Sequence, residues 1–189
     1  LQEVMTDFWE NHFTVYAGKG ITRFFIPAYD REVIRPHALG HFRDLLGAVA
    51  KSPAMLFFLD QWQSAADSAH PTLAGRAAGA MSVDDVQALA PNRTLTAAQR
   101  RRLERMSPEE RARLVQQRTR QAQRGRGLNE NYARELMELH TLGVDAGYTQ
   151  GDIIEVARAL TGWTMAARQG AGFEFRPQIH DAGPKVVLG

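Results

Sequence analysis

The stretch Asn129–Gly143, which reads NENYARELMELHTLG, decides the fold expected for this chain of 189 residues. Either Asn129 or Asn131 is suited to cap a helix, because an asparagine side chain accepts hydrogen bonds from free backbone N–H groups. Apolar residues then recur at helical spacing as far as Leu142, and Gly143 ends the pattern. The stretch therefore predicts an amphipathic helix that ends at about Leu142.

One face of this predicted helix carries polar side chains. At about 100° per residue, Glu135 and Glu138 lie about 60° apart, and Asn131 and Arg134 extend the same stripe. His140 lies on the apolar side, about 140–160° from both glutamates. This helix alone therefore cannot chelate a metal through His140 and a glutamate, and we expect His140 to be a hydrogen-bonded core residue.

The two glutamates are the first candidate site. Carboxylates one helical turn apart repel each other, and burial would raise the pKa of one of them. Glu135 and Glu138 are therefore candidate acid–base groups or ligands of a hard cation, with Asn131 and Arg134 as candidate substrate contacts. The interpretation that we favour is a network on the helix surface, because Arg134–Glu138 and Asn131–Glu135 are each spaced by four residues.

The elements that follow complete the expected fold. Thr149 and Asp152 have the spacing of a capping box and predict the start of another helix. Further along, Phe173–Arg176 and Lys185–Leu188 are expected to be short strands joined by a turn-rich segment. These elements predict a mainly α fold, a helical domain with a small two-stranded β ribbon near the C-terminus.

A second candidate site lies between the two predicted strands. His180 is a candidate base or metal ligand, Asp181 a candidate ligand or orienting group, and Lys185 a candidate contact for an anionic substrate. The alternative is equally weighted: Asp181 forms an Asx turn before Gly183, and His180 simply packs.

Helices are also expected in the part of the chain that precedes the stretch Asn129–Gly143. Apolar residues recur every three or four positions over 1–16, and His41–Lys51 shows the same spacing. Ser52-Pro53 predicts the start of a further helix, which we expect to continue to about Ser64.

Positive charge is concentrated in one segment. Residues 63–127 contain 12 Arg and 6 acidic residues, a net charge of +6, whereas the rest of the chain has 11 basic and 15 acidic residues, a net charge of −4. This break in composition predicts an Arg-rich helical insertion at about 63–127. The segment 93–126 has no aromatic residue to stack on bases, so a solvated helical excursion is favoured and nucleic acid is not the expected partner.

Capping signals place two helices in this insertion. Thr96 with Gln99 and Ser107 with Glu110 predict polar helices near 97–106 and 108–124. The segment His70–Ala80, which contains proline and glycines, is expected to be a loop.

The composition of the chain and the motifs that it lacks argue against several classes of protein. The chain has no cysteine, and it contains no run of about 18 apolar residues that would cross a membrane. No glycine-rich nucleotide loop and no His-Glu-x-x-His pattern is present. At this length we expect residues 1–189 to form one domain. Because the first residue is Leu1 and not methionine, we expect this domain to be a fragment of a larger protein.

Besides the run Gly127–Gly143, several shorter segments form a recognisable pattern; in order along the chain they are Trp9–Phe13, Ser52–Leu56, Leu59–Ser64, Gly147–Gln150, Ala157–Trp163 and His180-Asp181 with Lys185 and Gly189. Together these segments resemble a large bacterial family known as domain of unknown function 1800. The resemblance covers most of the chain outside the Arg-rich insertion and implies no established reaction. It implies a bacterial protein, exported to the periplasm or cell envelope, that is often encoded beside a sulfatase-like exported protein.

Two functions follow as expectations. The first is a helical module for assembly or partner binding in an exported or envelope-associated protein. The alternative is a metal-assisted hydrolase whose site combines the helix bearing Glu135 and Glu138 with the turn at His180-Asp181. Its cofactor would be a divalent metal, held by Glu138, His180 and Asp181.

Overall fold

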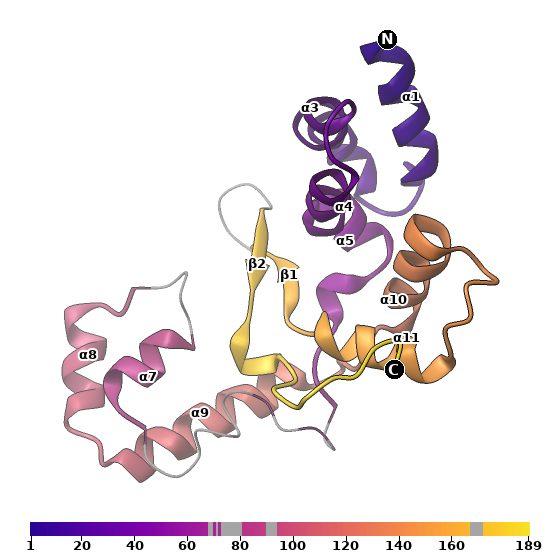
Figure 1. The fold of residues 1–189 in the computed structure, drawn as a ribbon. Coiled ribbons are helices and arrows are strands. Elements are labelled where there is room, and N and C mark those ends of the chain that lie inside the picture. Colours follow the sequence, from indigo (N-terminus) through magenta and orange to yellow (C-terminus); the bar gives the residue numbers. More distant parts are fainter. Residues whose placement is uncertain (68–69, 71, 73–80, 90–93, 167–171) are drawn as a thin grey trace.

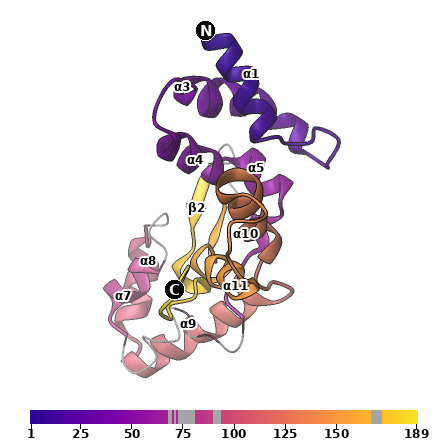
Figure 2. The same cartoon turned by 45° about the vertical axis from the view of Figure 1, so that its right-hand side comes forward.

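The structure, a computed structural model, describes residues 1–67, 70, 72, 81–89, 94–166 and 172–189. The described part is mainly helical with one two-stranded antiparallel sheet, which confirms the expected fold class. Figure 1 shows three groups of elements: helices α1–α5 at one end, the helices α7–α9 at the other, and the pair α10 and α11 with the sheet between them. Figure 2 shows the same order after rotation.

The N-terminal group surrounds the largest apolar core. It comprises α1 (Gln2–His12), η1 (Thr22–Phe24), α2 (Ile26–Ala28), the π-helical η2 (Tyr29–Ile34), α3 (Arg35–His37), α4 (Phe42–Lys51), α5 (Pro53–Phe58) and η3 (Gln61–Gln63). Buried side chains from these elements meet Tyr132 of a later helix; they are Phe13, Tyr29, Ile34, Leu45, Val49, Ala54 and Met55. This core ties the signature stretch to the N-terminal helices.

The helix that starts after Ser52 is shorter than expected. Ser52 accepts a hydrogen bond from the Met55 N–H, as the sequence indicates, but α5 ends at Phe58 and not near Ser64. Asp60 has a φ of 59°, in the left-handed region that a short polar residue tolerates and that interrupts an α-helix. The chain then continues as the 3-10 turn η3.

The basic segment forms α7 (Val83–Ala88), α8 (Ala97–Glu104) and α9 (Pro108–Gln123). The two capping boxes expected at Thr96 and Ser107 are present, and another begins at Ser82. These helices enclose a small core of their own, which consists of Met81, Val86, Leu103, Ala112 and Val115. The loop expected over His70–Ala80 lies almost entirely outside the described residues.

The two ends of the basic segment lie side by side. Ser64 and Gly127 form an isolated parallel bridge, and the Ala65 N–H donates to the Gly127 carbonyl at 3.0 Å. This closure is the geometry that an insertion between two parts of one body requires, and the insertion itself stays a prediction.

The C-terminal group contains α10 (Glu130–Met137), the π-helical η4 (Glu138–Leu142), α11 (Gln150–Ala159), β1 (Trp163–Met165), β2 (Phe173–Phe175) and η5 (Pro177–Ile179). Helices α10 and α11 pack through Ala133, Met137, Ile153 and Ala157. In the sheet, Trp163 pairs with Phe175 and Met165 pairs with Phe173.

The ribbon exists, but the expected pairing of its strands was wrong. The partner of β2 is β1, which precedes it, whereas Lys185–Leu188 is not a strand. Backbone N–H groups of that segment instead donate to carboxylates of α11: Val186 to Glu155 at 3.3 Å and Leu188 to Asp152 at 2.6 Å. The apolar residues of Lys185–Leu188 predicted strand pairing, but the backbone of this segment bonds to side chains of α11.

Candidate functional site

The signature helix is fixed at its start by Asn129. Its side-chain oxygen accepts from the Tyr132 N–H at 3.0 Å, and its amide donates to the Leu59 carbonyl at 2.7 Å. Tyr132 is buried, and its hydroxyl donates to the Ala50 carbonyl at 2.6 Å. The predicted cap is therefore also a long-range link between α10 and the N-terminal helices.

The helix changes from α-helical to π-helical winding at Glu138, the second of the two candidate glutamates. It is α-helical to Met137 and π-helical from Glu138 to Leu142, and it stops at Gly143, which has a φ of 92°. Short π-helical turns inside helices are often found at functional sites. His140 lies within this turn and is buried.

His140 is buried, in agreement with the core position expected for it. Its ring lies 5.2 Å from the Phe13 ring, and the His12 Nε2 lies 3.3 Å from its backbone carbonyl. Burial, with a smaller contribution from the nearby His12, lowers the pKa of His140 to about 4. His140 is therefore neutral at neutral pH.

The polar stripe of α10 contacts α11. Arg134 donates to the Gln150 side chain at 2.7 Å, and Gln150 in turn donates to Glu130 at 2.6 Å. Arg134 is thus bonded to the neighbouring helix, whereas the sequence favoured a link to Glu138. Glu135 and Glu138 are half-buried and Asn131 is exposed. Desolvation, and then the charge of Glu138, raises the pKa of Tyr148 above its usual value.

The second candidate site is built around a buried ion pair. Arg158 of α11 is 7% exposed and Asp181 is fully buried. The Arg158 Nε donates to one Asp181 oxygen at 2.6 Å and its Nη2 to the other at 3.4 Å, while its Nη1 donates to both Glu155 oxygens at 2.6 and 2.7 Å. A guanidinium matches the geometry of a carboxylate in this way.

Backbone groups complete the surroundings of Asp181. The Gly183 N–H donates to its side chain at 2.7 Å, which is the Asx turn that the sequence offered as an alternative, and the Asp181 N–H donates to the Thr161 hydroxyl at 2.8 Å. Burial raises the pKa of the Asp181 carboxyl, but Arg158, the Gly183 N–H and Lys185 outweigh it and hold the pKa below its usual value. Asp181 is therefore an anion in the folded protein.

His180 and Lys185 flank this pair. The His180 Nδ1 lies 2.8 Å from the Thr161 carbonyl, which can only accept, so Nδ1 carries the proton. Burial, assisted by the charge of Lys185, lowers the pKa of His180. Lys185 donates to the Asp181 carbonyl, and its ammonium lies 3.9 Å from the Asp181 side chain.

Two glycines permit this close packing. A Cβ atom on Gly183 would lie 2.7 Å from the Arg158 guanidinium and 3.0 Å from the Asp181 carboxylate. A Cβ atom on Gly162 would lie 2.7 Å from the Arg176 carbonyl, and Gly162 also has a φ of 82°. Gly162 lies in Ala157–Trp163, one of the segments that carry the family resemblance.

The structure brings together only part of the predicted site. His180, Asp181 and Lys185 meet one another at the C-terminal end of α11, whereas Glu135 and Glu138 lie on α10 and η4. In the described ranges, no three His, Cys, Asp or Glu side chains are arranged to hold a metal ion. The described residues thus do not form the ligand set expected from Glu138, His180 and Asp181.

A shallow groove of 580 Å³ runs beside the ion pair. It lies between α11 and the C-terminal segment, and its lining includes Asp152, Glu155, Arg158, Pro184 and Val186. The fully buried Asp181 is not part of this lining, whereas its partner Arg158 is.

Sequence reasoning missed the residues that organise this cluster. Arg158 and Thr161 were noted only as part of a family segment, and no role was expected for them. The i,i+3 spacing of Glu155 and Arg158 is a local signal for their pair. No local signal connects Arg158 with Asp181, because they are 23 positions apart.

One of three comparisons with known proteins finds a match, and that match is to a protein family. No curated protein and no solved structure matches the chain. No helix in the described part of the chain is long and apolar enough to cross a membrane. One family model, that of a protein of unknown function, DUF1800, matches residues 1–189. The chain belongs to the DUF1800 family, as the signature 129–143 and its companion segments indicate.

Proposed function

We propose that this chain is a helical partner-binding module of an exported or envelope-associated DUF1800 protein. The observation that supports this function is an exposed apolar row on α1. Leu1, which immediately precedes α1, lies on the same side as Val4 and Phe8 within it, and the three are 86%, 69% and 53% exposed. Large exposed apolar surface is typical of a protein that binds a partner.

A second exposed apolar group adjoins the far end of α1. It consists of Leu139 and Leu142 of η4 and Val144 just beyond it. The two elements meet where His12 contacts the His140 carbonyl, and the Phe8 ring stacks on the His12 ring at 6.4 Å. We therefore infer that α1 and η4 form one binding surface, and that the signature stretch holds its second half in place.

The partner that we propose is a sulfatase-like exported protein encoded near this one, as the family resemblance implies. The test is a binding titration between the two purified proteins, using Phe8→Ser. We expect this change to weaken binding about tenfold or more, since it removes an aromatic side chain from the centre of the surface.

Phe24→Ser is the matched control for this titration. It makes the same replacement at a phenylalanine that is 66% exposed on η1. Binding that is absent in the wild-type protein, or that both variants weaken equally, would contradict the proposed surface. Cell fractionation of the full-length protein tests its export separately.

The metal-assisted hydrolase stays a prediction with less support. The cluster at Asp181 is satisfied by Arg158 and Gly183, and the described residues assemble no ligand set. Metal content measured on protein purified without chelator, beside Glu138→Gln and His180→Ala, tests it. A stoichiometric metal that both variants lose would place the two motifs in one metal site and would favour a hydrolase screen, whereas no metal in the wild-type protein, with both variants folded, would contradict this function.

A further inference from the structure

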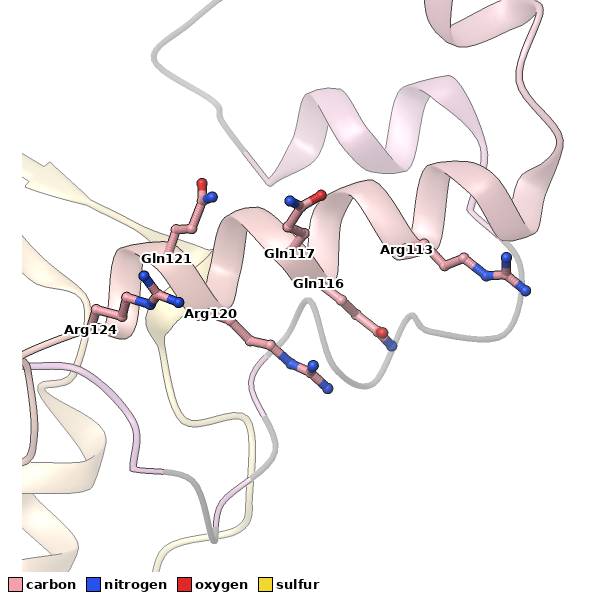
Figure 3. Close-up of a pocket in the computed structure, with 6 residues that line it drawn as sticks. All are labelled: Arg113, Gln116, Gln117, Arg120, Gln121 and Arg124. Carbon is pink, nitrogen blue, oxygen red and sulfur yellow. The ribbon is translucent and has the colours of Figure 1, made fainter.

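We propose that Arg113 and Arg120 of α9, together with Arg124 just after its last residue, form a contact row for the phosphate backbone of double-stranded nucleic acid. This site is separate from the α1–η4 surface, and its test does not depend on that surface. The row borders a surface pocket of 340 Å³ that Gln116, Gln117 and Gln121 also line. Figure 3 shows the six side chains along α9 and at its C-terminal end, with Gln117 and Gln121 pointing to the other side from Arg113, Gln116 and Arg120.

The three arginines are aligned along the axis of α9. At about 100° per residue they lie within about 40° of one another, and at 1.5 Å per residue they span about 16 Å. Ala112, Val115 and Thr119 are buried on a different side of the helix. The arginine row is thus a straight line of positive charge on the exposed side of a helix whose other side is anchored.

Most carboxylates of this region are engaged elsewhere; the exception is Glu109, which is held mainly by hydrogen bonds from its own backbone and from Ser107 at the start of α9 but also attracts Arg113 electrostatically. Asp84 and Glu104 pair with Arg100, at 2.9 and 3.4 Å, and Asp85 and Glu110 close capping boxes. Among the described residues, no carboxylate forms an ion pair with Arg113, Arg120 or Arg124. Their charge is therefore available to an external anion.

Two other arginines of this region have structural roles. Arg111 donates to the Met81, Leu103 and Met106 carbonyls, and Arg126 donates to the Trp62 carbonyl. The arginines of the row make no such bonds within the described residues.

The chemistry of the row favours phosphate. The guanidinium fork matches two phosphate oxygens, and the amide of Gln116, which points the same way as Arg113 and Arg120 in Figure 3, adds a neutral donor. One row of contacts follows a linear polyanion, and phosphate contacts of this kind account for sequence-independent binding to nucleic acid.

The same surface disfavours two other polyanions. No large apolar side chain is exposed among the described residues of 81–127, so the region lacks the apolar anchor of an interfacial membrane helix. The segment 93–126 has no aromatic residue, and single-strand binding relies on stacking of bases on aromatic rings. A duplex needs neither, because its phosphates are on the outside.

The test is fluorescence anisotropy of a labelled 24-base-pair duplex of arbitrary sequence, titrated with the whole chain at several salt concentrations. If the row neutralises three phosphates, the affinity should fall about 40-fold between 50 and 200 mM salt. The triple variant Arg113→Gln, Arg120→Gln, Arg124→Gln should lose most of the binding at 50 mM salt and most of the salt dependence. Glutamine keeps the helix propensity of arginine, so α9 should remain folded.

The matched control is Arg23→Gln, Arg31→Gln, Arg43→Gln, which removes the same charge from exposed arginines of the N-terminal group. It should bind the duplex within twofold of the wild-type protein. Equal losses in the two triple variants, or wild-type binding that is absent or insensitive to salt, would overturn the proposal. Tighter binding to the single strand, or binding only to phosphatidylglycerol vesicles, would overturn it in favour of the other polyanions.

Discussion

The basic helices α7–α9 and the helix pair α10–α11 are both polar at the surface, but different interactions hold them. In α7–α9 most side-chain hydrogen bonds join residues that are close in sequence, as in the capping boxes at Thr96 and Ser107. In α10–α11 several join residues that are far apart in sequence: Asn129 donates to Leu59, Tyr132 to Ala50, and Arg158 to Asp181. A local pattern therefore describes the first region well and the second incompletely.

The largest expected difference concerns two arginines with two carboxylate partners each. Arg158→Met leaves the buried carboxylate of Asp181 without its main partner, so we expect the free energy of unfolding to fall by about 3–5 kcal/mol. Arg100→Met removes pairs with Asp84 and Glu104 whose side chains are 80% and 53% exposed, so the loss should be below about 1 kcal/mol. Urea denaturation of both variants measures the difference, and equal losses would show that the buried pair is not specially important.

A smaller difference is expected at two glycines. Gly162→Ala adds a Cβ atom 2.7 Å from the Arg176 carbonyl at a φ of 82°, so both a clash and backbone strain apply. We expect a loss of about 3 kcal/mol. Gly125→Ala, at a φ of 70° with no atom within 4 Å of the new Cβ, should cost only the strain of about 1 kcal/mol. Thermal unfolding compares them, and a Gly125 effect as large as that of Gly162 would contradict the close approach.

The sequence predicted the local features of both regions. Capping residues at Ser52, Thr96, Ser107, Asn129 and Thr149 all cap helices. Each such cap depends on residues within three or four positions, so the pattern is readable from the chain. The same is true of Gly143, whose positive φ ends the signature helix.

Features that depend on distant partners were not readable. The segment Lys185–Leu188 has the composition of a strand, yet Glu155 and Asp152 of α11 accept its hydrogen bonds. Asp181 was expected at a site of chemistry or in an Asx turn, but its burial with Arg158 follows only from the packing of the C-terminal segment on α11. The candidate site was thus predicted as a group of residues, and its organising partner was not.

Acid sensitivity should also distinguish the two regions. The pKa of His140 is about 4 in the folded protein, below its value of 6.5 in the unfolded chain, so the unfolded state binds more protons between these values. Stability should fall as the pH drops from about 6.5 to 4, by about 2–3 kcal/mol from this residue, and then change little from this cause. The described residues of α7–α9 include no histidine to add to this effect.

His140→Gln should remove that part of the pH dependence, as measured by urea denaturation at intervals from pH 7 to pH 4. His41→Gln, at an exposed histidine that precedes α4, should retain it. A slope that is unchanged in His140→Gln would assign the acid sensitivity to other groups, such as His180, whose pKa is also lowered.

The smallest expected difference is between two capping residues. Thr96→Ala removes a capping interaction that involves only Gln99, and it should cost about 1 kcal/mol. Asn129→Ala removes the same kind of cap and also the bond to the Leu59 carbonyl, so a loss of about 2 kcal/mol is expected.

Hydrogen exchange separates the effects of these two variants better than the total free energy of unfolding does. Thr96→Ala should increase exchange within α8 alone, because its bonds are local. Asn129→Ala should increase exchange in α5 as well as α10, since one side chain joins both helices; exchange confined to α10 would show that the signature stretch is held by its own helix and not by the N-terminal core.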